Sequence, residues 1–449
     1  MNYLFEKVDN TKLIFFRILF GFLMMLECWG AIATGWVEQT FVKVDYTFNF
    51  IGFEWTHFLL GEPMYFIYGL MGFLGFLVMM GAFYRVSSML LFLLWALTYF
   101  MQKSNYNNHY YFLVWLSFFM AIVPANQFYS VDASMNAKIS SNSAPRWTIL
   151  IFQIQLAILY FFAAVAKLYP GWLDNHYLPL RLEQSAQWFS HTEHFKFMAK
   201  FLRIPDLAPF LAYGGIVFDF LFVPLLMFKP TRKLAFFAAL LFHIFNSITL
   251  HVGIFPYLAL AMSLFFFDTE TLKKEIFPFK SRAMISDDLF EKKSRQALIT
   301  YAFVGLTLLQ IYLPLRHWLI PDDVLWTEEG HRMAWRMMLR EKSGEISFET
   351  HLPNGKIVQE NLQDFLRPHQ IYGVQTKPDF IWQYAQELKK RYRAKGVEGV
   401  KIYAKNSCLS INGGPCHPFI NPQVDLANTK WSYFGHQSFI LPSPKEYYR

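Results

Sequence analysis

Long apolar runs, separated by polar segments, dominate the first 314 residues of the chain. Several are shorter than the roughly 20 residues that cross a bilayer at 1.5 Å per residue, so we expect the helices to extend into the neighbouring loops. For the shortest runs, a re-entrant or interfacial helix is the alternative. The pattern predicts a polytopic helical bundle of about nine spans. The predicted spans are Leu13–Ile32, Met64–Phe83, Ser87–Met101, His109–Ile122, Trp147–Ala166, Pro209–Phe228, Leu234–Leu250, Ile254–Phe267 and Ala297–Pro314.

After Pro314 the long apolar runs stop, and the spacing of apolar residues changes. Residues 341–359 alternate up to a turn at Asn354-Gly355, which predicts a β-hairpin. Val400–Ile420 predicts a second hairpin, and Phe380–Lys395 has the spacing of a helix with a basic face. We therefore predict a transmembrane domain over residues 1–314 and a mostly β extramembrane domain over residues 315–449.

The composition supports a membrane protein. Of the 449 residues, 54% are hydrophobic, 19% aromatic and only 16% charged. These values exclude a disordered chain, a disulfide scaffold and an ordinary soluble enzyme. The net charge of +8 is not taken as a nucleic-acid signal, because basic residues in loops between spans serve to set orientation.

The basic residues also predict which side each loop faces. With a cytoplasmic N-terminus, the inner loops hold fifteen Lys and Arg and the outer loops hold seven. This bias follows the positive-inside rule. It places the C-terminal domain outside, in the periplasm if the chain is bacterial. Cys408 and Cys416 then face an oxidising compartment. The sequence leaves two alternatives for them, a disulfide or two free thiols.

Polar residues within the spans are the first candidates for function, because they are costly in a bilayer. Lys167 closes the fifth span, His109 opens the fourth, and His243 lies one turn from Asn246 in the seventh. Asp219 lies within the sixth span. Most of these groups fall near the outer surface, so one site open to the outside would gather them.

Each candidate also has a purely structural interpretation. Lys167 would simply extend its amine to the interface, and His109 would be an interfacial histidine beside Tyr110 and Tyr111. His243 with Asn246 would be an interhelical hydrogen-bonding pair. Asp219 would pair with a polar group on a neighbouring helix.

A metal site is not predicted. His191 and His194 have i, i+3 spacing, but no third and fourth ligand follow at a recognisable distance in the sequence. A solvated loop is the better interpretation of this pair.

Four stretches of the membrane part resemble the vitamin K-dependent γ-glutamyl carboxylase family, whose membrane part is the horizontally transferred transmembrane domain. Two segments beyond the membrane also look like family segments. Together they cover nearly the whole chain, and the collinear set is specific although no single piece is. The six stretches are residues 107–110 (NNHY), 125–132 (ANQFYSVD), 163–168 (AAVAKL) followed by Gly171-Trp172, 242–247 (FHIFNS), 334–338 (AWRMM) and 420–425 (INPQVD).

The resemblance implies an oxygen-dependent epoxidation of vitamin K hydroquinone coupled to γ-carboxylation of a peptide glutamate, with CO₂ as the third small reactant. By position, Lys167 matches the base that deprotonates the hydroquinone, and His109 matches the residue that assists the glutamate step. Desolvation at an apolar span end favours the neutral amine that a base requires. The residues expected to bind the hydroquinone are Asn108, His243, Asn246 and Trp335.

The sequence departs from the animal enzymes in two places. Ala166-Lys167 stands where they have two adjacent lysines, and their long C-terminal extension has no counterpart here. We therefore expect a bacterial-type member with a lipid bilayer, a quinol and a glutamate-containing peptide as partners. Two alternatives stay open: a vitamin K quinol epoxidase that carboxylates nothing, and a non-catalytic membrane module that binds a quinone or lipid.

Overall fold

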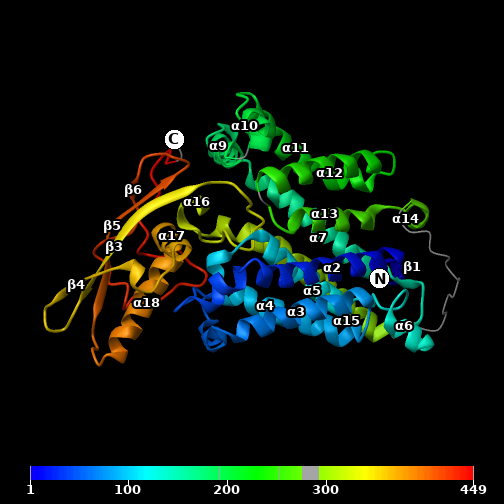
Figure 1. Cartoon of the computed structure of the whole chain (residues 1–449), viewed down its shortest axis with the longest axis horizontal. Helices are drawn as coiled ribbons and strands as arrows, with labels where there is room; N and C mark the ends of the chain where they lie inside the picture. Colours follow the sequence, from blue (N-terminus) through cyan, green and yellow to red (C-terminus); the bar gives the residue numbers. More distant parts are fainter. Residues whose placement is uncertain (1, 192, 251, 276–292, 448–449) are drawn as a thin grey trace.

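The computed structural model describes residues 2–191, 193–250, 252–275 and 293–447. Within them, a bundle of long helices is joined to a small sheet with its own helices (Figure 1). The N-terminus lies at the end of the bundle away from this sheet (Figure 1).

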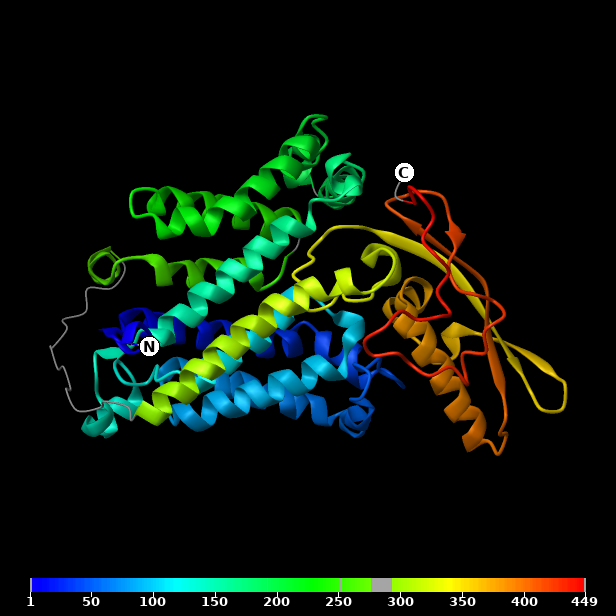
Figure 2. The ribbon, with the colours of Figure 1, turned by 180° about the vertical axis from the view of Figure 1, so that it is seen from behind.

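Each of the nine predicted spans corresponds to a helix in the described residues. The helices run back and forth between the same two ends of the bundle (Figures 1 and 2). They are α2 (Thr11–Ala33), α3 (Pro63–Met80), α4 (Tyr84–Met101), α5 (Asn108–Ile122), α7 (Trp147–Ala166), α11 (Leu207–Met227), α12 (Arg232–Thr249), α13 (Phe255–Ser263) and α15 (Lys293–Leu315).

The predicted count of nine spans is not confirmed. Among the described residues, six helices are long and apolar enough to cross a membrane: α2, α3, α4, α7, α11 and α15. With 15 and 9 residues, α5 and α13 are short for a crossing. Although α12 has 18 residues, it begins with Arg232 and Lys233 and contains His243 and Asn246, which lower its hydropathy.

Small residues let the first two long helices approach closely. A Cβ added at Gly21 of α2 would lie 2.4 Å from the backbone nitrogen of Met79, and one at Gly75 of α3 would lie 2.8 Å from that of Met25. After α3, Gly81 has a φ of 63°, in the left-handed region that suits glycine. The chain reverses there and enters α4 at Tyr84, which agrees with the two separate spans predicted on either side of this turn.

The upper layer in Figure 1 consists of α11, α12 and α13. It connects to the rest of the bundle through α7, which packs against α11, α13 and α15. Between α7 and α11 the chain forms three short helices at the end nearer the sheet, α8 (Pro170–Leu173), α9 (Tyr177–Ser190) and α10 (Lys196–Leu202). The other short helices of the membrane part are α1 (Asn2–Phe5), α6 (Val131–Met135) and α14 (Thr269–Glu275), and β1 (Lys7–Asp9) pairs with β2 (Ser143–Pro145).

The C-terminal region contains an antiparallel sheet in the order β4-β3-β5-β6. Both predicted hairpins are present: β3 (Lys342–His351) pairs with β4 (Ile357–Glu360), and β5 (Lys401–Ile411) pairs with β6 (His417–Pro418). The predicted helix is α18 (Pro378–Ala394), preceded by α17 (Pro368–Thr376). A further short helix, α16 (Val324–Thr327), follows the bundle, and Cys408 and Cys416 form a disulfide across the second hairpin.

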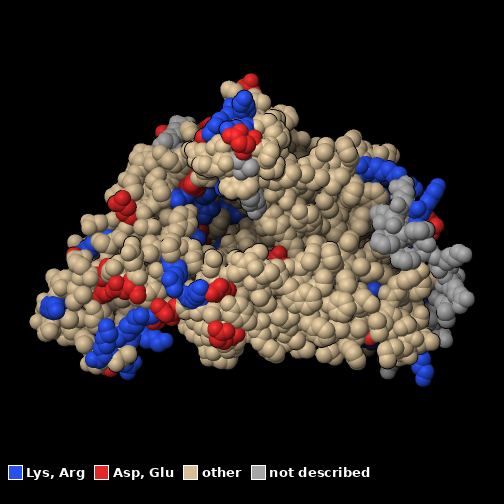
Figure 3. Space-filling model, in the orientation of Figure 1, with Lys and Arg blue, Asp and Glu red and all other residues tan. Residues whose placement is uncertain are grey.

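Charge follows the same division. The face in Figure 3 carries few Lys, Arg, Asp or Glu atoms over the long helices, and these atoms gather toward the sheet and at the opposite end. A hollow opens below α9 and α10 in this view, and Lys and Arg atoms are visible inside it (Figure 3). The long helices therefore present an apolar surface suited to lipid.

Candidate active site

Lys167 directly follows α7 and is held by an acidic residue of the next long helix. Its Nζ donates to Asp219 Oδ2 of α11 at 2.5 Å and to the carbonyl oxygen of Ala163 at 3.2 Å. The side chains of Lys167 and Asp219 are only 11% and 6% exposed. The ammonium also lies 5.5 Å from the centre of the Trp172 ring. The amine therefore turns into the protein, and Asp219 has the cross-helix partner that its position predicts.

Two turns before Lys167, α7 carries a second polar contact. The hydroxyl of Tyr160 and Nε2 of His243 are 2.7 Å apart, and both side chains are buried. Nδ1 of His243 is buried without a hydrogen-bond partner in the described residues. Because a buried unpaired nitrogen is costly, it marks a position where a polar ligand group would be stabilised.

His109 meets His243 through an aromatic ring of α13. The ring of Phe255 stacks on His109 at a centroid distance of 5.0 Å and contacts His243 edge-on at 5.7 Å. The two histidines come from α5 and α12, which are distant in sequence. Only the packing of α13 against both brings them to one place.

The segment that follows the bundle closes this cluster from the side of the sheet region. The Asn108 amide donates to the carbonyl oxygen of Arg336 at 3.0 Å, and the Trp335 ring lies 4.9 Å from that of Tyr111. Trp335 has a φ of 54°, which is unfavourable for a residue with a side chain. The loop thus accepts local strain while placing the buried indole against α5.

Four predicted site residues therefore meet around Phe112 and Phe255, whose rings are 6.0 Å apart: Asn108, His109, His243 and Trp335. Lys167 lies farther along α7, outside this cluster. Seven residues separate it from Tyr160, which corresponds to about 10 Å along α7. Asn246 lies half-buried one turn beyond His243, and its expected role stays a prediction.

Sequence reasoning missed Tyr160 and Phe255, and it did not connect Asp219 with Lys167. The available signal was helical spacing. Tyr160 is seven residues before Lys167, so both side chains lie on one face of α7. Phe255 carries no such signal, because an aromatic residue in an apolar run is ordinary.

A cavity of about 360 Å³ lies between the ends of α7 and α15 and the loop that carries Trp335. It is lined by Ala166, Leu168 and Tyr169 on either side of Lys167, and by Arg336. Arg336 is 9% exposed, and its Nε has no hydrogen-bond partner in the described residues. Burial and the nearby Arg340 lower the pKa of Arg336 to about 10, which still leaves the guanidinium charged at neutral pH.

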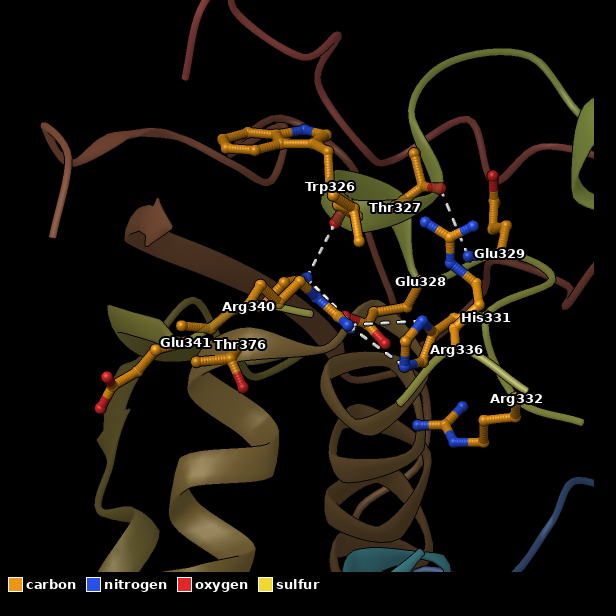
Figure 4. A network of polar contacts seen from close by, with 12 residues as sticks. Trp326, Thr327, Glu328, Glu329, His331, Arg332, Arg336, Arg340, Glu341 and Thr376 are labelled. Atoms are coloured by element: carbon orange, nitrogen blue, oxygen red, sulfur yellow. Dashed lines mark hydrogen bonds and ion pairs between the residues drawn. The ribbon is translucent and has the colours of Figure 1, made fainter. Parts of the chain in front are cut away.

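A buried charge network lies next to this loop (Figure 4). Glu328 is ion-paired with Arg340 and, at 2.6 Å, with Lys342. Burial alone would raise the pKa of Glu328, but these two cations outweigh it and hold the pKa well below the usual range. The His331 ring faces Arg340 in the same network (Figure 4).

A second buried group joins the bundle to the sheet region. Asp379 of α18 is ion-paired with Lys103, which precedes α5, and with Arg332 at 2.9 Å. Burial opposes the charge of Asp379, yet Arg332 and Lys103 lower its pKa to about 2. Nothing in the sequence pattern links these residues, because 276 positions separate Lys103 from Asp379.

In the part of the chain that the structure describes, no group of three or more His, Cys, Asp and Glu is arranged to hold a metal ion. His191 and His194 lie on the exposed stretch between α9 and α10.

The chain matches two family models that together span most of its length. Residues 5–270 match the HTTM domain, and residues 295–446 match the vitamin K-dependent gamma-carboxylase, lumenal domain. No solved structure matches the chain. The order of the two matched domains is the one in which the bundle and the sheet region follow each other along the chain. The protein is a multi-pass membrane member of the vitamin K-dependent gamma-carboxylase family.

Proposed function

We propose that this protein epoxidises vitamin K hydroquinone with O₂ and uses the strong base so formed to carboxylate a peptide glutamate with CO₂. The products are the epoxide, γ-carboxyglutamate and water. One observation supports the proposal most directly. The buried Lys167–Asp219 pair lies two turns along α7 from Tyr160, whose hydroxyl contacts the buried His243, and His109 shares the Phe255 ring with His243. The cavity next to Lys167 is lined by Arg336, whose Nε has no hydrogen-bond partner in the described residues.

In this proposal, the Lys167–Asp219 pair takes the proton from the hydroquinone. The neutral amine of Lys167 accepts the proton, and the Asp219 carboxylate holds the amine in place and stabilises the ammonium so formed. The Tyr160 hydroxyl and His243, 2.7 Å apart, orient the quinol oxygen. These groups are largely shielded from water, which a strongly basic intermediate requires.

The glutamate enters from the outer side. Arg336 lines the cavity and supplies a cation for the substrate carboxylate. Asp322 and Asp323 also line it, and their carboxylates accept hydrogen bonds from Ser443 and from the backbone of Leu325. Asn108 holds the backbone of Arg336 and is adjacent to His109, so the carboxylate would lie near the histidine assigned to the glutamate step. His109 stabilises the charge that develops as the γ-proton leaves.

The test uses purified protein in lipid nanodiscs, reduced vitamin K, a glutamate peptide and labelled bicarbonate. Epoxide and fixed label are scored separately. We expect both products in a fixed ratio. Epoxide without fixed label would leave only the epoxidase alternative. If neither epoxide nor fixed label is formed, the enzyme assignment is rejected in favour of a binding module.

A further inference from the structure

One large cavity lies far from the candidate active site. It has a volume of about 990 Å³ and lies at the end of the bundle where α4 and α15 begin and α5 ends. Its walls come from the start of α15, the start of α7 and the segment between α5 and α7.

One side of the cavity is the apolar helix α15, most of whose surface is not covered by other helices. Only 11% of the most apolar 18-residue stretch of α15 is buried inside the protein. The helix packs mainly against α7. Its wall residues include Leu298, Ala302, Phe303 and Leu306. Between Arg295 and Leu306 the groove follows α15 for about 16 Å, which is about half of the 30 Å hydrocarbon core. The groove therefore has the depth of one leaflet.

The mouth of the groove is basic. Arg85, Lys138 and Arg295 line it and are exposed, and Lys7 lies beside them. The acidic residue in the lining, Glu6, is ion-paired with Arg146 at 2.7 Å. Among the described lining residues, basic side chains therefore outnumber acidic ones at the mouth.

Two lining side chains also present unused hydrogen-bonding atoms. Nε1 of Trp147 and Oε1 of Gln127 are buried and have no partner in the described residues. Buried polar atoms normally have partners. A ligand with polar oxygen atoms at the depth of these residues would satisfy the indole N–H.

We infer that this groove binds an anionic phospholipid of the leaflet that faces the N-terminal end of the protein. The phosphate lies against Arg85, Lys138 and Arg295, and an acyl chain lies against Ala302 and Phe303. A basic mouth above an apolar wall of one-leaflet depth matches this ligand in charge, polarity and length. The inference does not depend on the proposed chemistry.

The test compares phosphatidylglycerol with phosphatidylcholine carrying the same acyl chains, by native mass spectrometry of the full-length protein. The parent should retain phosphatidylglycerol preferentially. A triple variant, Arg85→Gln with Lys138→Gln and Arg295→Gln, should lose at least about tenfold of that preference. A matched triple variant at the other end of the bundle, Lys196→Gln with Lys200→Gln and Arg203→Gln, should keep it.

A separate variant tests the apolar wall. Ala302→Trp fills the groove and should reduce retention of both lipids, while size-exclusion and thermal unfolding profiles report whether the fold is intact. Equal retention of the two lipids by the parent would overturn the inference. So would an equal loss in the two triple variants, because that would reflect overall charge. Unchanged retention in Ala302→Trp would place the lipid on the surface and not in the groove.

Discussion

Lys167 is the residue whose chemistry can be tested most sharply. Arginine keeps a long side chain and a positive charge, so it can still pair with Asp219, but its pKa above 12 prevents it from acting as a base. Lys167→Arg should therefore lower epoxidation and carboxylation by about 100-fold or more while membrane insertion is unchanged. The two rates are measured with the nanodisc assay, and insertion by fractionation.

Lys167→Ala provides the complementary evidence. A small amine added to this variant should restore part of both activities, and the restored rate should follow the free-base fraction of the amine as pH rises. Near-normal turnover in Lys167→Arg would refute the role as base.

Variants of Asp219 test the same pair, and they should affect stability and activity differently. Asp219→Asn leaves a buried ammonium without its carboxylate, so it should cost about 3–5 kcal/mol of stability and most of the activity. Replacing both partners, as Lys167→Met with Asp219→Leu, removes the buried charges and should recover the stability. Thermal unfolding and the nanodisc assay measure the two effects. A double variant that regains activity would show that the pair is only structural.

The two histidines should differ although they share Phe255. His109→Ala should lose carboxylation and retain measurable epoxide, because the histidine acts on the glutamate step. His243→Ala should weaken quinol binding and reduce both products, since it removes the partner of Tyr160. The Michaelis constant for the quinol and the ratio of fixed label to epoxide separate these outcomes. Identical profiles would show that this division of roles is wrong.

At the scale of elements, the contact between α18 and the loop before α5 should depend on pH. The pKa of Asp379 falls from an ordinary 3.8 to about 2 in the folded protein, because Arg332 and Lys103 outweigh the effect of burial. Its stabilisation is therefore present above about pH 3.8 and is lost as the pH falls through 2. Lys377 also faces this group and remains charged in that range.

Hydrogen exchange of α18 between pH 5 and pH 2 measures this contact. The protection factors, which correct for the slower intrinsic exchange at low pH, should fall in the parent as the pH falls. Asp379→Asn should have low protection factors throughout, and the surface variant Glu398→Gln, whose partner Arg393 is exposed, should behave like the parent. A parent without pH dependence would mean that the ion pairs do not hold the sheet region to the bundle.

For the whole molecule, the arrangement of the helices bears on topology. The N-terminus and the sheet lie at opposite ends of the bundle (Figure 1). Six crossings would return the chain to the side where it started, so we expect an odd number of the remaining helices α5, α12 and α13 to cross as well.

We therefore predict a cytoplasmic N-terminus and an external C-terminal domain. A reporter fused after Arg449 should be active only in the external compartment, and one inserted after Pro230, between α11 and α12, only in the cytoplasm. Activity of the C-terminal fusion in the cytoplasm would contradict the orientation that the basic residues indicate.

The sequence alone determined where the helices and hairpins lie. Apolar runs must be helical in lipid, because only a helix pairs every backbone group within its own segment. Alternation around Asn354-Gly355 similarly identifies a hairpin. The family segments lie along the chain, so their residue types could also be recognised. The break between the predicted spans Met64–Phe83 and Ser87–Met101 likewise agrees with the turn at Gly81 between α3 and α4.

Only the tertiary structure decided which polar residues meet. Asp219 is 52 positions from Lys167, and His243 is 83 positions from Tyr160. Helical period shows which face a residue occupies, but not which helix packs on that face. The same holds for Lys103, Arg332 and Asp379. They form ion pairs only when the sheet region packs on the bundle. Contacts between distant segments depend on packing, for which a local pattern carries no signal.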